Sequence, residues 1–284
     1  MVEATKKIAF IGGDERMLFA AEMFAKNGFE AAVYGFGPVA ELYGKAENKS
    51  TAASALAGAE YAVLPPVVSR DGENIFAPLA SEKLPLKEID FGKTTVFCGA
   101  FCPLIEAKTR SYTADESFAV RNALPTAESA LKIAMEETRQ TICGMRACVL
   151  GFGRIAKLLA KNLLALGACV DVFARRSEAR AIAEVMGAHA YDFGELGAKI
   201  ASYDCIFNTV PQNIIGEREL EKIKRGAPLI ELASAPGGAD AEEAKKAGVR
   251  LIPAGGLPGK IMPKTAGKII YETIKEMMDE EENT

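Results

Sequence analysis

Short apolar runs alternate with segments of helical periodicity along this chain, which is the pattern of an α/β fold with parallel sheets. In the first part the pattern predicts four strands, at residues Ile8–Ile11, Glu30–Tyr34, Tyr61–Leu64 and Thr94–Cys98. In the second part it predicts about six, at Ala147–Leu150, Ala168–Phe173, His189–Tyr191, Asp204–Asn208, Pro228–Glu231 and Arg250–Ile252. We therefore expect two doubly wound sheets.

Two further helices are predicted where the sheets end. Residues Pro125–Ile142 have apolar positions at helical spacing, with Thr126 as the expected N-cap, and they predict a long helix that joins the two sheets. The segment Pro263–Met278 predicts a last helix that crosses back to the first sheet. The expected division is a substrate-binding or catalytic domain over residues 1–124, completed by 265–284, and a nucleotide-binding domain over residues 125–264.

Residues Cys148–Ser177 carry the clearest chemical signal. They follow the order strand, Gly-rich turn, helix and second strand, which is typical of a Rossmann-like dinucleotide-binding unit. Gly151 and Gly153 let a pyrophosphate approach the backbone, and Ala156 takes the third small position, where the helix packs on the strand. Plain close packing also uses small residues, but here an apolar strand precedes the motif and a helix of suitable length follows.

The end of the second strand indicates which dinucleotide binds. An NAD site usually has Asp or Glu there to hold the ribose 2′-hydroxyl, whereas this chain has Ala174 followed by Arg175, Arg176 and Ser177. Guanidinium groups and a hydroxyl attract a 2′-phosphate, so we expect NADP rather than NAD. The alternative is that the two arginines only form a solvated turn.

Three later loops follow predicted strands, at the edge where open α/β sheets bind ligands. The loops at residues 208–211, 232–238 and 255–260 are rich in Gly and Pro, as rigid turns around a coenzyme would be, although ordinary loops share this composition. The expected coenzyme-binding residues come from the glycine turn, the second strand end and these loops: Gly151, Phe152, Gly153, Arg154, Ile155, Ala174, Arg175, Arg176, Ser177, Asn208, Thr209, Val210, Pro211, Ser234, Leu257 and Pro258.

Composition narrows the class of partner. The chain has 284 residues, of which 49% are hydrophobic, enough for the cores of two domains. Its net charge of −4 and lack of a basic stretch argue against nucleic acid and favour small molecules. The six cysteines are scattered, which predicts reduced thiols and no metal site. No signal-peptide pattern and no uncharged apolar run of about 18 residues is present, so we expect a cytoplasmic protein.

Five segments together resemble one family. They are IGGDERM near the start, PTAESA in the joining helix, VLGFGRIAKLLA at the glycine turn, FNTVP after a later strand and LPGKIMPKTAGKII near the end. Over nearly its full length the chain resembles the A subunits of dipicolinate synthase from endospore-forming bacteria and, more distantly, formate and D-2-hydroxyacid dehydrogenases. The resemblance implies NADP-dependent oxidation of dihydrodipicolinate to dipicolinate (pyridine-2,6-dicarboxylate) in sporulation, together with a flavoprotein-like B subunit. Homo-oligomers are expected by analogy with the related dehydrogenases.

That reaction suggests what the substrate site needs. A dicarboxylate requires fixed cations, alignment of a ring carbon with the nicotinamide, and a group that accepts one proton. We expect carboxylate binding by Arg16, in the turn after the first strand, and by Lys260 and Lys264 in the late Gly/Pro-rich loop. The other candidates are Thr126, Ser129 and Thr265 as hydrogen-bond donors to the substrate, and Asp14, Glu128 and Lys260 as catalytic groups.

Two other functions remain open. If the chemistry resides in the B subunit, the chain is a non-catalytic NADP-binding partner, and the sequence does not separate this case from the first. A 2-oxoacid or 2-hydroxyacid reductase is disfavoured, because such enzymes normally use a histidine late in the nucleotide domain as acid and base. The single histidine of this chain, His189, lies instead at the start of a predicted strand on the adenine half.

Overall fold

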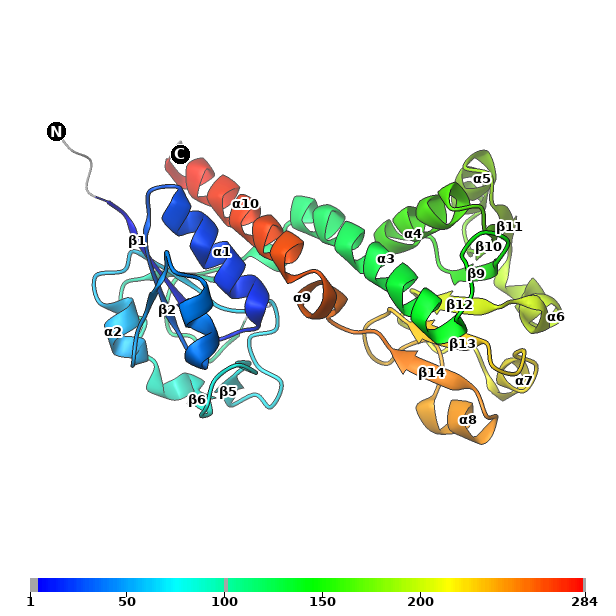
Figure 1. Ribbon diagram of the computed structural model, residues 1–284, viewed down its shortest axis with the longest axis horizontal. Helices are drawn as coiled ribbons and strands as arrows, with labels where there is room; N and C mark the ends of the chain where they lie inside the picture. Colours follow the sequence, from blue (N-terminus) through cyan, green and yellow to red (C-terminus); the bar gives the residue numbers. More distant parts are fainter. Residues whose placement is uncertain (1–4, 100–101, 283–284) are drawn as a thin grey trace. The chain divides into compact units, whose positions relative to one another are not determined.

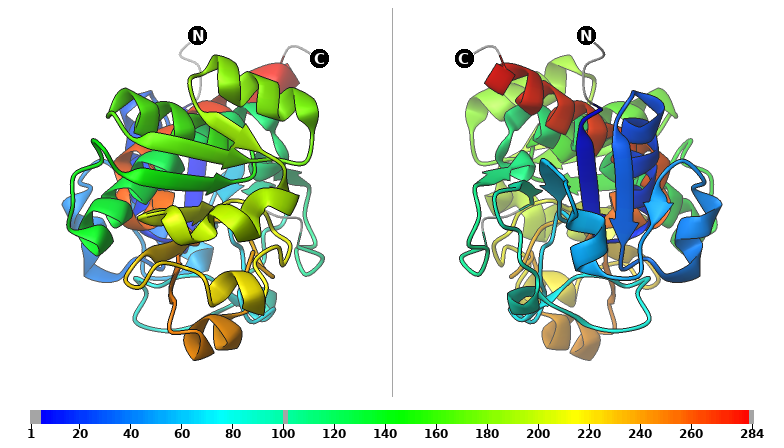
Figure 2. Two further views of the ribbon diagram at one scale, coloured as in Figure 1. Left: turned by 90° about the vertical axis from the view of Figure 1, so that its right-hand side faces the viewer. Right: turned by 90° about the vertical axis from the view of Figure 1, so that its left-hand side faces the viewer.

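The chain forms two compact units, shown in a computed structural model that describes residues 5–99 and 102–282 (Figure 1). The first unit contains Met1–Asn122 and Pro258–Thr284, and the second contains Ala123–Leu257. Each is built on a parallel sheet of six strands with helices against it (Figures 1 and 2). The predicted α/β fold with two Rossmann-like domains is therefore confirmed.

The sheet of the first unit has the strand order β3-β2-β1-β4-β7-β8. Its strands are β1 (Lys7–Ile11), β2 (Glu30–Tyr34), β3 (Glu47–Asn48), β4 (Tyr61–Val63), β7 (Thr95–Cys98) and β8 (Thr109–Ser111). The apolar pattern missed β3 and β8, because both are short, polar strands at the edges of the sheet. A separate hairpin is formed by β5 (Asn74–Ile75) and β6 (Leu84–Pro85).

Alternate residues of these strands enter two different cores. Ile8 and Phe10 of β1 share a buried cluster with α1 (Glu15–Lys26) and α10 (Pro263–Glu282). Ala9 and Ile11 share another with Ala55 of α2 (Ala52–Leu56) and with the β5–β6 hairpin. Successive side chains of a strand point to opposite faces of the sheet, and both faces are buried here. The strand therefore appears in the sequence as a continuous apolar run.

The last helix of the chain belongs to the first unit. Helix α10 runs beside α1 (Figure 1), and its residues Ile270, Ile274 and Met278 are buried in the same cluster as Phe24 of α1. The predicted return of the C-terminal helix to the first domain is confirmed. Short 3₁₀ turns complete this unit: η1 (Gly37–Leu42), η2 (Leu86–Glu88) and η3 (Tyr112–Ala114).

The sheet of the second unit has the order β11-β10-β9-β12-β13-β14, which is the doubly wound order of a dinucleotide-binding domain. Its strands are β9 (Arg146–Leu150), β10 (Cys169–Phe173), β11 (His189–Tyr191), β12 (Cys205–Asn208), β13 (Pro228–Glu231) and β14 (Arg250–Pro253). Its helices are α4 (Arg154–Ala165), α5 (Ser177–Val185), α6 (Leu196–Lys199), α7 (Glu217–Leu220) and α8 (Ala241–Lys246), with 3₁₀ turns η4 (Phe193–Glu195) and η5 (Ile200–Ser202). All six predicted strands are present.

The joining helix, α3 (Glu116–Thr138), is longer at its start than predicted and carries Pro125 in its interior. Asp115 precedes it, and its Oδ1 accepts hydrogen bonds from Ser117 Oγ at 2.5 Å and from the Phe118 amide at 2.9 Å. These bonds hold the pKa of Asp115 below its usual value, and the bond from Ser117 has the largest effect. The prediction of Thr126 as N-cap is therefore wrong: a proline removes one helical hydrogen bond, and the cap that starts this helix lies upstream.

Candidate coenzyme and substrate sites

The glycine turn after β9 has the geometry that a dinucleotide needs. Gly151 has φ 92°, and a Cβ built there would lie 2.4 Å from Thr209 Oγ1, so a side chain at this position would not fit. A Cβ at Gly153 would meet nothing within 4 Å. Among the described residues, no side chain caps the N-terminus of α4 at Gly153, so its first backbone amides can donate to an anion.

A pocket of about 420 Å³ opens beside this turn. The residues that line it are Gly151, Phe152, Gly153, Ala174, Arg175, Arg176, Ala179, Phe193 and Val210. They come from the turns that follow β9 and β10, the start of α5, the turn η4 and the loop after β12. The pocket thus lies at the carboxyl edge of the sheet, where doubly wound folds bind nucleotides. Sequence reasoning missed Ala179 and Phe193, which only the folding of α5 and η4 brings to this edge.

A third arginine supports the turn that follows β10. Arg180 of α5 donates from Nη1 to the carbonyl oxygens of Ala174 at 2.7 Å and Arg175 at 2.8 Å. The same nitrogen lies 3.2 Å from Asp192 Oδ2. Arg180 thereby binds the backbone of the turn at two successive carbonyl groups. The sequence offered no signal for this role beyond the presence of an arginine in a helix.

The two predicted phosphate-binding arginines have different partners. Arg175 donates from Nη2 to Gln212 Oε1 at 2.6 Å, and Arg176 forms an ion pair with Glu178 at 3.2 Å. Both arginines are exposed at the pocket. Ser177 is also exposed and is the first residue of α5. The strand end therefore presents positive charge to the pocket.

The carboxylate of β10 is buried away from solvent. Asp171 is 8% exposed, and its Oδ2 accepts a hydrogen bond from the Tyr203 hydroxyl at 2.8 Å. Burial raises the pKa of Tyr203 well above its usual range, so this hydroxyl remains a neutral donor. Asp171 consequently has the position of a structural residue and not that of a ribose-binding acid.

The loops after β12 and β13 are held together by one carboxylate. Glu231 Oε1 accepts from Asn208 Nδ2 at 2.7 Å and from the Ala233 amide at 3.0 Å, and Oε2 accepts from the Gly238 amide at 2.7 Å. Asn208 also donates to the carbonyl of Val210 and accepts from its amide. Asn208 is fully buried, so this predicted coenzyme residue shapes the loop through its protein contacts. The sequence did not single out Glu231.

The other predicted coenzyme residues fall in or near these loops. Thr209 Oγ1 donates to the carbonyl of Leu150 at 2.7 Å, which places it against the glycine turn. Pro211 and Ser234 are exposed in the loops after β12 and β13. Leu257 and Pro258 are buried, and the prediction that they lie in a loop is wrong, because they begin the short helix α9 (Leu257–Ile261). A proline at the second helical position is compatible with this start.

In the first unit, Asp14 and Arg16 form a two-point ion pair. Asp14 caps α1, and its carboxylate accepts from Arg16 Nε and Nη2, each at 2.7 Å. The Asp14 side chain is only 20% exposed and the Arg16 side chain only 11%. A Cβ built at Gly259 of α9 would lie 2.2 Å from Arg16 Nη2, so the backbone of α9 rests on the pair. The structure thus joins two residues for which separate roles are predicted.

The first sheet lacks room for a dinucleotide at the corresponding turn. A Cβ at Gly12 would lie 2.7 Å from Ile75 Cγ2, and one at Gly35 would lie 2.5 Å from Leu84 Cδ1. The β5–β6 hairpin that supplies these two side chains therefore covers the carboxyl ends of β1 and β2. With the Asp14 carboxylate at the N-terminus of α1, where a phosphate would otherwise bind, this turn is not suited to a nucleotide.

The remaining candidates are divided between exposed and buried positions. Lys260 of α9 and Lys264 and Thr265 of α10 are exposed, as is Glu128 of α3. Thr126 and Ser129 are buried on α3. In the described part of the chain the Ser129 hydroxyl has no hydrogen-bond partner. These side chains are polar groups of the required kinds, and their roles stay predictions.

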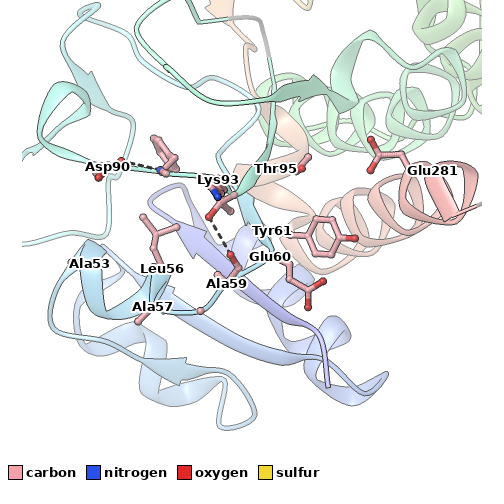
Figure 3. Close-up of a pocket in the computed structure, with 14 residues that line it drawn as sticks. Ala53, Leu56, Ala57, Ala59, Glu60, Tyr61, Asp90, Lys93, Thr95 and Glu281 are labelled. Atoms are coloured by element: carbon pink, nitrogen blue, oxygen red, sulfur yellow. Dashed lines mark hydrogen bonds between the residues drawn. The ribbon is translucent and has the colours of Figure 1, made fainter. Parts of the chain in front are cut away.

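A larger pocket, of about 690 Å³, lies at the edge of the first sheet where the parallel strands begin (Figure 3). It is lined by residues at the amino ends of β4 and β7, including Glu60, Tyr61 and Thr95, and by Glu281 of α10. Doubly wound sheets bind ligands beyond the carboxyl ends of their strands, so this pocket is not a candidate for the coenzyme or the substrate.

Metal-binding clusters and membrane spans are both missing from residues 5–99 and 102–282. These residues contain no group of three or more His, Cys, Asp or Glu side chains placed to hold a metal ion. Within the same ranges, no helix combines the length and the apolar composition needed to span a membrane.

Known families match both parts of the chain. The family model for the N-terminal domain of the dipicolinate synthase A subunit matches residues 7–121. The family model for the NAD binding domain of D-isomer specific 2-hydroxyacid dehydrogenases matches residues 120–239, which include the glycine turn and its pocket. The second unit is therefore a dehydrogenase-type domain for a nicotinamide dinucleotide.

Individual relatives align along nearly the whole length. The dipicolinate synthase A subunit of Bacillus subtilis (strain 168) is 29% identical over 286 residues, covering 96% of each chain. The crystal structure of the dipicolinate synthase A subunit from Bacillus halodurans is 25% identical with a TM-score of 0.85, covering 96% of this chain and 97% of that one. The crystal structure of the corresponding Bacillus subtilis protein is 27% identical with a TM-score of 0.81, covering 98% and 97%.

Proposed function

We propose that this chain, which is similar to dipicolinate synthase A subunits along nearly its whole length, oxidises dihydrodipicolinate to dipicolinate with NADP. The dehydrogenase-type nucleotide domain supports an oxidoreductase reaction. Hydride acceptance is the chemistry that a bound nicotinamide supplies. Because the relatives are named as A subunits, we also propose that the chain works with a B subunit, in the dipicolinate synthesis of sporulation.

The end of β10 is the observation that carries the choice of coenzyme. Arg175 and Arg176 line the pocket directly after Ala174, while Asp171 is buried against Tyr203. Guanidinium groups at this rim favour a 2′-phosphate over a free 2′-hydroxyl. A carboxylate in the same place would have had the opposite preference.

The open space at the glycine turn supports an orientation of the coenzyme in which its pyrophosphate binds there. We propose that the backbone at Gly151–Gly153 and the first amides of α4 hold the pyrophosphate, since this N-terminus has open space in front of it. Phe152, Arg154 and Ile155 flank that contact. The proposed neighbours of the nicotinamide and its ribose are Thr209, Val210, Pro211, Ser234, Leu257 and Pro258, with Asn208 shaping their loop.

For the substrate we propose carboxylate binding by Arg16, Lys260 and Lys264. Asp14 engages Nε and Nη2 of Arg16, so a substrate carboxylate would use the Nη1 side of the guanidinium. The exposed Glu128 is a more available proton acceptor than Asp14, because both oxygens of Asp14 already accept hydrogen bonds. Thr126, Ser129 and Thr265 are proposed hydrogen-bond donors.

A 2-hydroxyacid reductase is disfavoured by the place of the single histidine. His189 is the first residue of β11, so it lies at the amino edge of the sheet. The glycine turn follows the carboxyl end of β9, which runs parallel to β11 with β10 between them. An acid or base for a hydroxyl group must reach the reacting atoms, and the opposite edge of the sheet is out of reach.

The test is turnover by the purified full-length chain. We expect NADPH absorbance to rise when the chain is mixed with NADP and enzymatically generated dihydrodipicolinate, and the Arg175→Ala/Arg176→Ala variant to need at least about tenfold more NADP, with its use of NAD unchanged. Turnover without a partner would eliminate a purely coenzyme-binding role. Turnover only with an added B subunit would assign the chemistry to the complex, and none in either case would refute the proposal.

A further inference from the structure

A side-chain hydrogen bond joins two walls of the coenzyme pocket. Arg175, on the turn after β10, donates from Nη2 to Oε1 of Gln212, on the loop after β12, at 2.6 Å. Arg175 and Val210 both line the pocket, and Gln212 follows Val210 by two residues. The bond therefore lies at the rim, above the strand ends, at the side where the proposed 2′-phosphate would bind.

The three arginines around this pocket differ in whether their hydrogen-bonding partners carry a negative charge. Arg176 is paired with Glu178 at 3.2 Å, and Arg180 donates to backbone carbonyls and lies 3.2 Å from Asp192. In the described ranges, the one side-chain partner of Arg175 is the neutral amide of Gln212. Arg175 thus keeps its full positive charge while one of its donors is held in a fixed direction.

We propose that Gln212 is a specificity-determining residue, which holds the Arg175 guanidinium in place to receive the 2′-phosphate of NADP. The inference rests on the proposed use of NADP. A guanidinium has five N–H donors, so the bond to Gln212 leaves four for phosphate oxygens. A neutral acceptor suits this role, since it orients the guanidinium without competing with the phosphate for its charge.

The isosteric substitution Gln212→Glu tests the idea directly. It keeps the shape of the side chain and the hydrogen bond, but it pairs Arg175 with a carboxylate and places negative charge beside the 2′-phosphate. We expect the NADPH dissociation constant to rise at least about tenfold, and that of NADH to change by less than about threefold. The measurement is fluorescence titration of the full-length chain with each reduced coenzyme, at two salt concentrations because the effect is electrostatic.

Gln140→Glu is a matched control. Gln140 is exposed in the same unit and is not among the residues that line the pocket, so the substitution makes the same charge change away from the coenzyme. Gln212→Ala is the second variant, which removes the support of Arg175 without adding charge. We expect it to weaken NADPH binding severalfold and to leave NADH binding unchanged.

The outcomes separate this inference from the proposed function. If the unmodified chain binds NADH as tightly as NADPH, the proposed coenzyme is wrong and this inference falls with it. If the unmodified chain prefers NADPH and Gln212→Glu behaves like Gln140→Glu, only the role of Gln212 is refuted. Equal weakening of both coenzymes by Gln212→Ala would indicate a general structural role and would also overturn the inference.

Discussion

Among single residues, Glu231 links the two proposed nicotinamide loops that follow β12 and β13. Its two oxygens accept from the side-chain amide of Asn208, at the end of β12, and from two backbone amides of the loop after β13. A carboxylate is required here because every group that faces it is a donor. A neutral amide of the same shape would direct an NH₂ group at one of those donors, whichever way it turned.

We therefore predict that Glu231→Gln lowers the free energy of unfolding by about 1–3 kcal/mol, since one donor loses its acceptor. We also expect weaker coenzyme binding, because the loops lose a shared anchor. Urea unfolding and NADPH titration measure the two effects. Glu221→Gln, at an exposed position of the same unit, is the control and should change neither. Unchanged stability of Glu231→Gln would contradict this account of the loops.

At the scale of elements, the packing of α10 on α1 depends on one small residue. A Cβ built at Gly267 would lie 2.5 Å from the carbonyl oxygen of Arg16 and 2.6 Å from Phe19 Cβ. The backbone of α10 therefore lies directly against the backbone of α1 at this point, with no space for a side chain. Buried apolar residues of α10, such as Ile270 and Ile274, complete the core of the first unit only while this approach is kept.

We predict that Gly267→Ala destabilises the first unit by a net amount of at least about 1 kcal/mol. Alanine favours a helix over glycine by about 1 kcal/mol, but overpacking against the backbone of α1 costs more than that gain. The control is Gly255→Ala, where an added Cβ would meet nothing within 4 Å. Thermal unfolding of both variants tests the point, and a Gly267→Ala chain as stable as the original would show that α10 can shift at little cost.

At the scale of the whole molecule, the hydrophobic clusters of the described residues each lie within one unit, two in the first and another in the second. The proposed coenzyme pocket is lined entirely by residues of the second unit. A ligand stabilises the structure that binds it, by about 2.7 kcal/mol at a hundredfold excess over its dissociation constant. The effect of coenzyme should consequently fall on one unit and not on both.

We expect scanning calorimetry of the full chain to resolve two transitions, of which NADPH raises one by several degrees. Limited proteolysis during heating would assign the raised transition, through the protection of residues 123–257. A single transition that shifts as a whole would mean that the two units unfold cooperatively, and it would rule out independent stabilisation.

The sequence by itself determined the features that depend on local chemistry and on periodicity. Apolar runs located every central strand, because these strands are buried on both faces. The glycine turn indicated a nicotinamide dinucleotide, because the motif depends on neighbouring residues in the chain, and the arginines after Phe173 predict NADP. The segments that resemble the family extended this identification over nearly the full length.

Only the tertiary structure decided which distant side chains meet. It brought Gln212 to Arg175 and Glu231 to Asn208, and it covered Gly12 with the β5–β6 hairpin. These contacts join different loops at one edge of a sheet, and the apolar pattern of a strand does not encode the course of its following loop. The start of α3 was missed for a related reason: a proline weakens a helix locally, while packing and the cap at Asp115 decide where the helix begins.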